Sequence, residues 1–304
     1  MNRTALLLGA AMSLGFPQHG LAGTETIAVT GDQAGGVPGG AFNSFSAPNL
    51  NDAGQVAFEA LLQTGVGGVL SLNDNGLWLD NTLLAREGSQ ASGAPGGAIF
   101  KTFLLEPILN DAGQVAYRAI LEIGPGGVDS LSDYGIWLDA TLIAREGSEA
   151  GDTPAGAVFS SLGSPRLNGA GQVAFSGTLR TGFGGVTSSD DTGIWLDSTL
   201  IAREGSQAGG LSSGEVFSQF SGLALNNAGQ VAYRGSLQIG VGGVDSTNDT
   251  GIWRGSNLIA REGSQAGGVA SGAVFNSLGS SAAMNDAGQV VYAAVLRSGL
   301  GGVD

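Results

Sequence analysis

The chain is built on one eight-residue stretch, Asn110-Asp-Ala-Gly-Gln-Val-Ala-Tyr117, which occurs five times with small changes. The copies begin at Asn51, Asn110, Asn168, Asn226 and Asn285, at intervals of 59, 58, 58 and 59 residues. Tandem units of this length stack on their neighbours and bury a shared core. The sequence therefore predicts one repeat domain rather than several independent folds.

Each repeat is predicted to form four short strands. The first runs from a Phe to the Asn of the motif, as over 217–226. Asn-Asp-Ala-Gly is a turn, because Asn and Asp side chains bond their own backbone and Gly accepts a left-handed conformation. The second strand alternates with period two, which puts Val115 and Tyr117 on one face. Gly-Ile-Trp-Leu-Asp over 135–139 and the segment 141–147 supply the third and fourth strands.

Insertions between repeats are confined to the first strand. A Trp follows each of the first four motif asparagines by 27 residues. The distance from the Phe to the Asn is 9 residues in three copies and 10 before Asn110 and Asn285. A strand that gains one residue without changing its buried face needs a bulge or a longer loop at its end. We predict a bulge in these two copies.

Four antiparallel strands per repeat favour an all-β fold, a β-propeller of about five four-stranded blades. Residues 26–32 align with the fourth strand of a unit, and we expect them to complete the last unit and close the ring. The last unit would then lack a Gly-Ile-Trp strand, so its blade is three-stranded or the array is longer. An open β-repeat array or solenoid is the alternative.

Residues 1–22 have the pattern of a signal peptide. Arg3 provides the positive start, and an apolar run extends from Ala5 to Phe16. This run is too short to cross a bilayer. We expect cleavage near Ala22 or Gly23, a single repeat domain over 23–304, and a location outside the cell, at its surface or in the periplasm, with no membrane insertion after cleavage.

Composition excludes several function classes. Against 12 Lys and Arg the chain has 26 Asp and Glu, a formal net charge of −14, which disfavours nucleic acid as a partner. The chain has no Cys, and its one His, His19, lies in the predicted leader. Cys nucleophiles, Ser-His-Asp triads and His-liganded zinc are therefore excluded from the mature chain.

Three sets of recurring residues are candidate sites. The motif asparagines and the Arg-Glu pairs are predicted to be structural, with charge-assisted hydrogen bonds between neighbouring blades or to loop backbone. The tryptophans are predicted to pack in the core, with sugar stacking as the functional alternative. Acidic loops before the third strands are capped turns or calcium sites. No other cofactor and no catalytic residue is predicted. The Arg-Glu pairs are Arg86-Glu87, Arg145-Glu146, Arg203-Glu204 and Arg261-Glu262; the tryptophans are Trp78, Trp137, Trp195 and Trp253; the acidic residues are Asp74, Asp133, Asp191 and Asp249.

The repeats also resemble a known family. Asn51-Asp-Ala-Gly-Gln-Val-Ala-Phe58 resembles the tandem NxxGxxxAF repeat of secreted bacterial proteins of the choice-of-anchor type, although Ala57 and Phe58 stand one position earlier than in that pattern. The resemblance implies an exported, β-propeller-like array with no established reaction.

We therefore expect a binding or scaffolding module that contacts an unknown glycan or protein ligand through loops at one end of the ring. Whether the protein is an enzyme is left open, with a non-catalytic role favoured because the copies are close to equivalent. The alternative is a carbohydrate-binding or glycoside-hydrolysing propeller, for which two carboxylates must lie about 5–10 Å apart.

Overall fold

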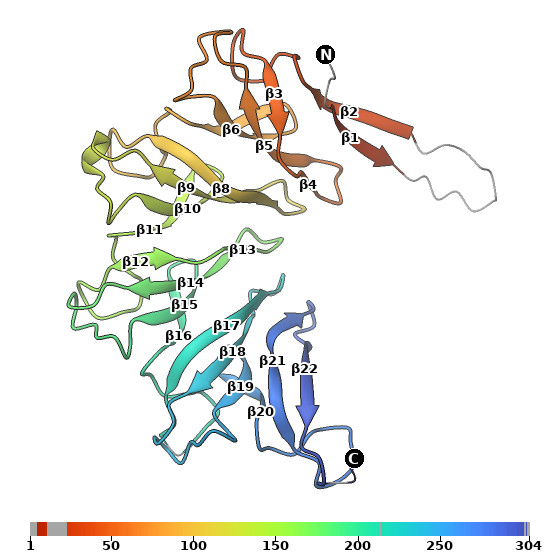
Figure 1. Cartoon of the computed structure of the whole chain (residues 1–304), viewed down its shortest axis with the longest axis vertical. Coiled ribbons are helices and arrows are strands. Elements are labelled where there is room, and N and C mark those ends of the chain that lie inside the picture. The colour runs from red at the N-terminus through yellow and green to blue at the C-terminus, as the bar shows by residue number, and fades with distance from the viewer. Residues whose placement is uncertain (1–4, 11–22, 213, 301, 303–304) are drawn as a thin grey trace, which may run out of the picture. The chain divides into compact units, whose positions relative to one another are not determined.

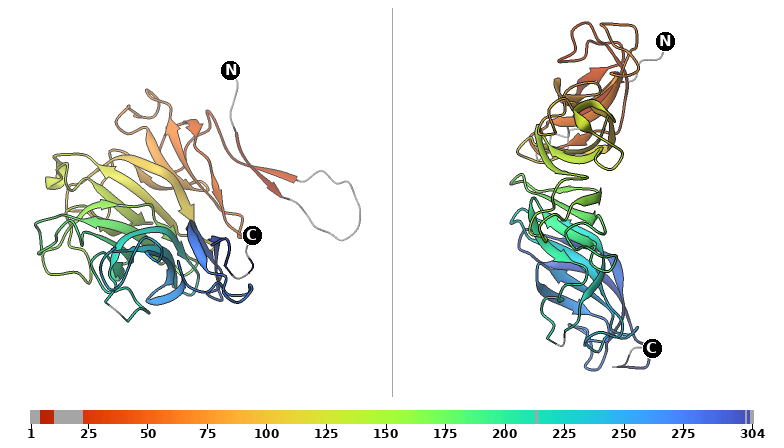
Figure 2. Two further views of the ribbon diagram at one scale, coloured as in Figure 1. Left: turned by 60° about the horizontal axis from the view of Figure 1, so that its bottom comes forward. Right: turned by 90° about the vertical axis from the view of Figure 1, so that its left-hand side faces the viewer.

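The computed structural model describes residues 5–10, 23–212, 214–300 and 302. It divides into two compact units, Met1–Leu142 and Ile143–Asp304, each of which is described by itself. Residues 1–4 and 11–22 of the predicted leader, with the predicted cleavage position, lie outside the described residues. The described part of the chain is all-β, and Figures 1 and 2 show strands and loops throughout. It contains no helix that could span a bilayer.

The strands form six antiparallel sheets, and none of these sheets is closed. In the first unit, β1 pairs with β2, the second sheet has the order β3-β5-β6-β7 with β4 beside β5, and the third has the order β11-β10-β9-β8. Their bounds are β1 Ala5–Ala10, β2 Gly23–Val29, β3 Phe42–Phe45, β4 Asn49–Leu50, β5 Val56–Leu62, β6 Asn75–Leu79, β7 Thr82–Arg86, β8 Phe100–Leu109, β9 Val115–Leu121, β10 Tyr134–Leu138 and β11 Thr141–Arg145, where the unit boundary falls. A short 3-10 turn, η1, covers Pro125–Gly127.

The second unit repeats this arrangement. One sheet has the order β12-β14-β15-β16 with β13 beside β14, another the order β17-β18-β19-β20, and β21 pairs with β22. Figure 1 shows β17 running beside β21. The bounds are β12 Phe159–Leu162, β13 Arg166–Leu167, β14 Val173–Leu179, β15 Thr192–Leu196, β16 Thr199–Arg203, β17 Phe217–Leu225, β18 Val231–Leu237, β19 Thr250–Arg254, β20 Asn257–Arg261, β21 Phe275–Met284 and β22 Val290–Leu296.

The four predicted strands per repeat are confirmed in the first four repeats, where the Phe strand is continuous or broken in two. The expected N-terminal strand exists as β2, which pairs with β1. Among the described residues β22 pairs with β21 alone. The strand pairing therefore establishes a series of repeated antiparallel sheets along the sequence.

The motif forms the predicted turn for the predicted reason. In the first copy the Oδ1 of Asn51 accepts a hydrogen bond of 2.8 Å from the main-chain N–H of Gln55. The N–H of Gly54 donates back to the carbonyl of Asn51 at 3.0 Å. Gly54 has a φ of 82°, in the left-handed region that glycine enters without steric cost.

The predicted bulges are confirmed, with one addition. Between residues 104 and 108, β8 advances four residues while its partner β9 advances only two. Between residues 278 and 282, β21 likewise advances four residues while β22 advances two. The corresponding stretch of β17 is one residue shorter, and there β17 advances three residues while β18 advances two. Every first strand also shifts register directly after its Phe, a bulge that the equal spacing of the repeats concealed.

Neighbouring repeats share their cores, as stacking requires. Ala57, Leu77 and Ala85 of the first repeat lie in one buried cluster with Phe100 and Trp137 of the second. In the second unit the same relationship holds between the third repeat and the fourth.

The motif turns of neighbouring repeats are also linked by hydrogen bonds. Within the first unit the Nδ2 of Asn51 donates to the carbonyl of Asn110 at 2.9 Å. Within the second, Asn168 donates to Asn226 at 2.9 Å, and Asn226 donates to Asn285 at 3.0 Å. Because these side chains stand at one position of each repeat, they form an asparagine ladder along each unit.

Candidate functional site

The tryptophans lie in the sheet cores. Trp78 is 0% exposed, and its indole stacks on Phe58 at an interplanar angle of 14° and meets Phe42 edge-on. Its Nε1 donates a hydrogen bond of 2.9 Å to the carbonyl of Gly35. Trp137, Trp195 and Trp253 are equally buried and donate to Ser92, Gly151 and Gly209. No indole face is therefore open to a sugar, which corrects the stacking hypothesis: in this fold the tryptophans are core residues.

The repeated arginines hold the loop that precedes the Trp strand of their own sheet. The Nε of Arg86 donates to the carbonyl of Asn73 at 2.7 Å, and its Nη2 donates to the Oδ1 of Asn73 at 2.9 Å. Arg203 makes the same two contacts with Asp190, including an ion pair of 2.8 Å. Bonds of this kind are charge-assisted and strong. The arginines thus act within their repeat, on the backbone and side chain of one loop residue.

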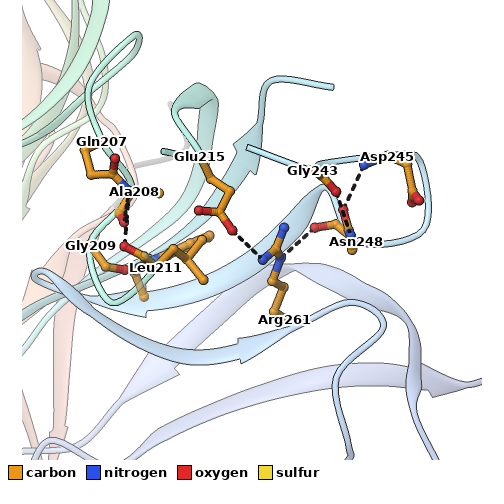
Figure 3. A network of polar contacts seen from close by, with 10 residues as sticks. Gln207, Ala208, Gly209, Leu211, Glu215, Gly243, Asp245, Asn248 and Arg261 are labelled. Carbon is orange, nitrogen blue, oxygen red and sulfur yellow. Dashed lines mark hydrogen bonds and ion pairs between the residues drawn. The ribbon is translucent and has the colours of Figure 1, made fainter. Parts of the chain in front are cut away.

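The fourth repeat adds one more acidic partner to this arrangement. The Nε of Arg261 donates to the carbonyl of Asn248 at 2.8 Å, and its Nη1 pairs with the Oε1 of Glu215 at 3.2 Å (Figure 3). Glu215 reaches in from the connection before β17 and is buried. Arg261 therefore ties that connection to the loop before β19. The corresponding Arg145 lies at the end of β11 with Glu146 after it.

The repeated glutamates lie beside the predicted calcium residues. Burial raises the pKa of Glu204, and the neighbouring carboxylate of Asp191 raises it further. Burial and then Asp74 raise the pKa of Glu87, although a backbone hydrogen bond from Asn75 works against both. Glu262 and Asp249 form a third such pair in which the pKa of the glutamate is raised. Protonation of Glu87, Glu204 and Glu262 is therefore favoured in the folded state relative to a solvated glutamate.

The predicted metal residues come from four separate loops. Each of them is the residue directly before the Trp strand of its own sheet: Asp74, Asp133, Asp191 and Asp249. In the part of the chain that the structure describes, no three His, Cys, Asp or Glu side chains form a group that could hold a metal ion. Calcium binding at these loops stays a prediction.

The structure reveals a surface that the sequence patterns did not indicate. Each loop between the second and third strands displays apolar side chains, and we name these the Gly-Gly-Val loops: residues 63–74, 122–133, 180–191 and 238–249. Their exposed fractions range from 41% to 76%. The exposed residues are Val66, Leu70, Leu72, Ile123, Leu131, Phe183 and Ile239, and Leu300 occupies a similar place after β22.

The Gly-Gly-Val loops are anchored at their base. The valine of each loop is buried, as Val69 is, and its carbonyl accepts a hydrogen bond of 2.8 Å from the N–H of the Gly four residues earlier. Gly67 has a φ of 57°, and a Cβ there would lie 2.1 Å from the carbonyl carbon of Gly39. Close backbone packing thus fixes the loop, and the residue before the two glycines is exposed in the first and third loops, as Val66 and Phe183, and half-buried in the other two. An apolar residue before Gly-Gly in each copy was the available signal.

Two comparisons with known proteins complete the description. The sequence profile of one family, described as "Family of unknown function (DUF7453)", matches the chain twice, over residues 15–141 and 126–302. No curated protein matches the chain. The two matched regions together take in every motif copy.

Proposed function

This chain belongs to the DUF7453 family, whose function is unknown, and we propose that it is an exported, non-catalytic binding or scaffolding module. The Gly-Gly-Val loops carry its contacts. The observation that supports this most is the recurrence of exposed apolar side chains on one anchored loop in successive repeats. Scattered exposed apolar residues are ordinary, whereas contiguous or repeated ones mark interaction surfaces.

The repetition favours many weak contacts over one strong one. Phe183 stands directly before the two glycines of the third loop, as Val66 does in the first. Ile239 stands two positions earlier in the fourth loop, as Ile123 does in the second, and the loops have the same construction. A ligand that engages several such loops gains avidity without any single tight contact. Equivalent copies suit binding to an extended or repetitive ligand better than they suit asymmetric catalysis.

We extend the proposal to architecture: the repeats close into a five-bladed propeller. Ala28 of β2 lies in the core cluster of the first repeat with Phe42, as Ala85 of β7 lies in that of the second repeat with Phe100. β2 thus has the packing role of a fourth strand from a preceding blade. A closed ring would also supply the next step of the asparagine ladder after Asn285.

The absence of cysteine makes ring closure directly testable. Asp52→Cys combined with Asp286→Cys joins the first and last motif turns, and a disulfide forms only if the turns are adjacent. Asp52→Cys with Asp111→Cys is the positive control, because the N–H of Asp52 donates to Asp111 at 3.0 Å. Disulfide formation in the control alone would favour the open array.

Export and surface location are part of the proposal. The residues that support them are the charged start and apolar run of 1–16, together with the resemblance to secreted NxxGxxxAF repeat proteins. Expression of the full chain in a bacterial host, followed by fractionation and mass determination of the N-terminus, tests both export and cleavage.

A second candidate is carbohydrate binding, and one residue favours it. Phe183 presents an aromatic ring that is 49% exposed, with the guanidinium of Arg180 5.3 Å from the ring centre. An exposed aromatic surface flanked by a polar group is suited to a sugar ring. In this second candidate function Phe183, and not a buried tryptophan, is the aromatic residue that stacks on the sugar.

One experiment tests both candidates. Full-length protein is applied to a glycan array and to a panel of immobilised extracellular proteins, with Phe183→Ser and Ile239→Ser in one variant as the loop-deficient comparison. We expect retention on one of these surfaces and its loss in the variant, with unchanged circular dichroism. Turnover of chromogenic glycosides would overturn the non-catalytic proposal, and equal retention of the variant would remove the loops from it.

A further inference from the structure

One position of the repeat changes its charge from copy to copy. It is the middle residue of the second strand, directly after the aromatic residue that ends the motif. Because neighbouring residues of a strand point to opposite faces, this side chain lies on the other face of the sheet from the aromatic ring. The residues at this position are Glu59, Arg118, Ser176, Arg234 and Ala293.

In the second and fourth repeats an arginine of the chain occupies this position. The guanidinium carbon of Arg118 lies 4.7 Å from the ring centre of Tyr134. The Nη2 of Arg234 donates to the Oγ1 of Thr250 at 3.2 Å. Burial raises the pKa of Glu262, and the positive charge of Arg234 opposes that rise. The fold therefore accommodates a guanidinium group on this face of the sheet.

In the first repeat a glutamate replaces the arginine, and a cavity of about 350 Å³ lies beside it. Ser44 and Asn75 both lie opposite Leu61 in the sheet, so these side chains share one face with Glu59. The residues that line the cavity come from β3, β5 and β6 and its near end, and none of them is basic. The local charge is thus negative where two other repeats carry a positive one.

The third repeat provides a neutral counterpart. Ser176 and Thr192 stand at the positions of Glu59 and Asn75, and they line a cavity of about 210 Å³. Its lining residues include no carboxylate. Charge, and not only shape, therefore distinguishes the cavity of the first repeat.

The carboxylate of Glu59 has an amide partner and, within the described residues, no basic one. Its Oε1 accepts a hydrogen bond of 2.7 Å from the Nδ2 of Asn75. Burial raises the pKa of Glu59, although the hydrogen bond from Asn75 works against that rise. A half-buried carboxylate without a counter-charge is stabilised by a cation that comes to lie beside it.

The side-chain oxygen of Asn75 is a second unused acceptor at this wall. Asn75 is 9% exposed, and in the part of the chain that the structure describes its Oδ1 has no hydrogen-bond partner. Buried acceptors in folded proteins are rarely left without a donor. The wall thus combines negative charge with an unpaired carbonyl oxygen, which suits a ligand that brings positive charge and several N–H groups.

We propose that the cavity over β3, β5 and β6 binds the guanidinium group of an arginine side chain from a ligand, with its N–H groups on Glu59 and its aliphatic stem on Leu61. Leu61 is 41% exposed and offers the apolar surface along which such a stem lies. A guanidinium is favoured because the chain itself places this group at the same position in two repeats. The lining residues lie outside the Gly-Gly-Val loops, so this inference does not depend on what those loops bind.

The test uses ¹⁵N-labelled full-length protein titrated with N-acetyl-arginine amide and followed by the amide resonances of Glu59, Leu61 and Asn75. We expect saturable shifts with a Kd of about 1 mM, as for a single small charged group. The amide resonance of Ser176 should not move. The citrulline counterpart of the probe has nearly the same shape without the charge, and it should bind about 10-fold more weakly. The lysine counterpart should also bind more weakly, because an ammonium group lacks the planar fork.

Three protein variants provide matched comparisons. Glu59→Gln removes the carboxylate and should weaken binding of the arginine probe about 10-fold. Glu122→Gln removes an exposed carboxylate of the same unit outside the cavity and should leave binding unchanged. Glu59→Arg combined with Asn75→Thr copies the pair of the fourth repeat, so it should fold as that repeat does and lose binding.

Several outcomes would overturn the proposal. Equal binding of the arginine and citrulline probes would show that charge is not recognised, and equal binding by Glu59→Gln and Glu122→Gln would place the ligand elsewhere. Absence of saturable shifts at the cavity resonances would leave it without a ligand of this class. Displacement of the arginine probe by calcium would assign the cavity to a metal ion, and tighter binding of the lysine probe would assign it to an ammonium group.

Discussion

The side-chain amide of Asn168 donates a hydrogen bond of 2.9 Å to the main-chain carbonyl of Asn226, 58 residues further along the chain. The same amide also donates to Gln172, and its oxygen accepts from the N–H groups of Gln172 and Ala170. One buried side chain therefore closes its own turn and links it to the next repeat. This double role explains why Asn is retained in all five copies of this sequence.

Asn168→Ala should lower the free energy of unfolding by about 2 to 4 kcal/mol, because several buried hydrogen bonds are lost together. Asn227→Ala is the control, since Asn227 bonds to Asp286 of the next turn in an exposed position. We expect its cost to be about 1 kcal/mol or less. Urea unfolding followed by tryptophan fluorescence measures both, and equal losses would argue against an energetic role for the buried ladder.

Trp195→Phe should destabilise the protein by about 2 to 3 kcal/mol. The smaller ring leaves a cavity beside Phe175 and Phe159, and the hydrogen bond of 3.0 Å to Gly151 is lost. Urea midpoints at constant slope measure the effect. A change below about 0.5 kcal/mol, the range of ordinary surface substitutions, would contradict the core placement of the indole.

Arg203→Lys should cost about 1 to 2 kcal/mol of stability although the charge is kept. An ammonium group cannot make both the Nε bond to the carbonyl of Asp190 and the paired Nη2 contact with its carboxylate. Hydrogen exchange should also quicken at the N–H of Thr187, which bonds to Asp190 at 2.6 Å. Arg180→Lys, on the same loop without this pair of contacts to Asp190, is the comparison and should leave that N–H unaffected.

Stability should rise as the pH falls from neutral to about 4.5. The pKa values of Glu87, Glu204 and Glu262 are raised in the folded state, chiefly by burial, above the ordinary value of about 4.3. Their contribution is fully present below that value and is lost as the pH rises through the folded pKa.

The carboxyl group of Asp190 limits how far the stability can rise as the pH falls, because its pKa is lowered in the folded state. Burial opposes ionisation of Asp190, but hydrogen bonds from Thr187 and the charge of Arg203 lower its pKa, so its contribution is lost at still lower pH. Glu204→Gln is neutral throughout and should be more stable than the unaltered protein at pH 7.5 but similar at pH 4.5. Urea midpoints at several pH values measure this, and parallel profiles would refute the link.

Much of the fold could be predicted because its signals are local and repeated. The turn at Asn51, the alternation in β9 and the extra bulges in β8 and β21 follow from glycine conformation, period two and a single inserted residue. The register of β1 with β2 could not be predicted, since residues 5–10 have no counterpart in the repeats.

The candidate site was less predictable, because spacing does not distinguish buried from exposed side chains. Trp78 lies two residues after Gly76 and Phe183 directly follows Gly182, yet the tryptophan is enclosed by its own sheet and the phenylalanine stands on a loop. The acceptors of the indoles are main-chain carbonyls of the preceding connection, which no residue pattern encodes. The sequence left two kinds of partner open for Arg86, a neighbouring blade or loop backbone. The structure shows the second, the carbonyl of Asn73.

The hydrogen bond from Trp137 to Ser92 also has an evolutionary consequence. Each indole donates to the connection that leads into its own sheet. The unit that can be duplicated with its indole and acceptor together therefore begins after a fourth strand, and not at the motif asparagine. Recombination that joined Gly88 to the segment following Gly147 would delete one whole module and leave every remaining indole with its acceptor. Gene duplication at these glycines can therefore lengthen or shorten the array by complete sheets, and family members should differ in multiples of this module.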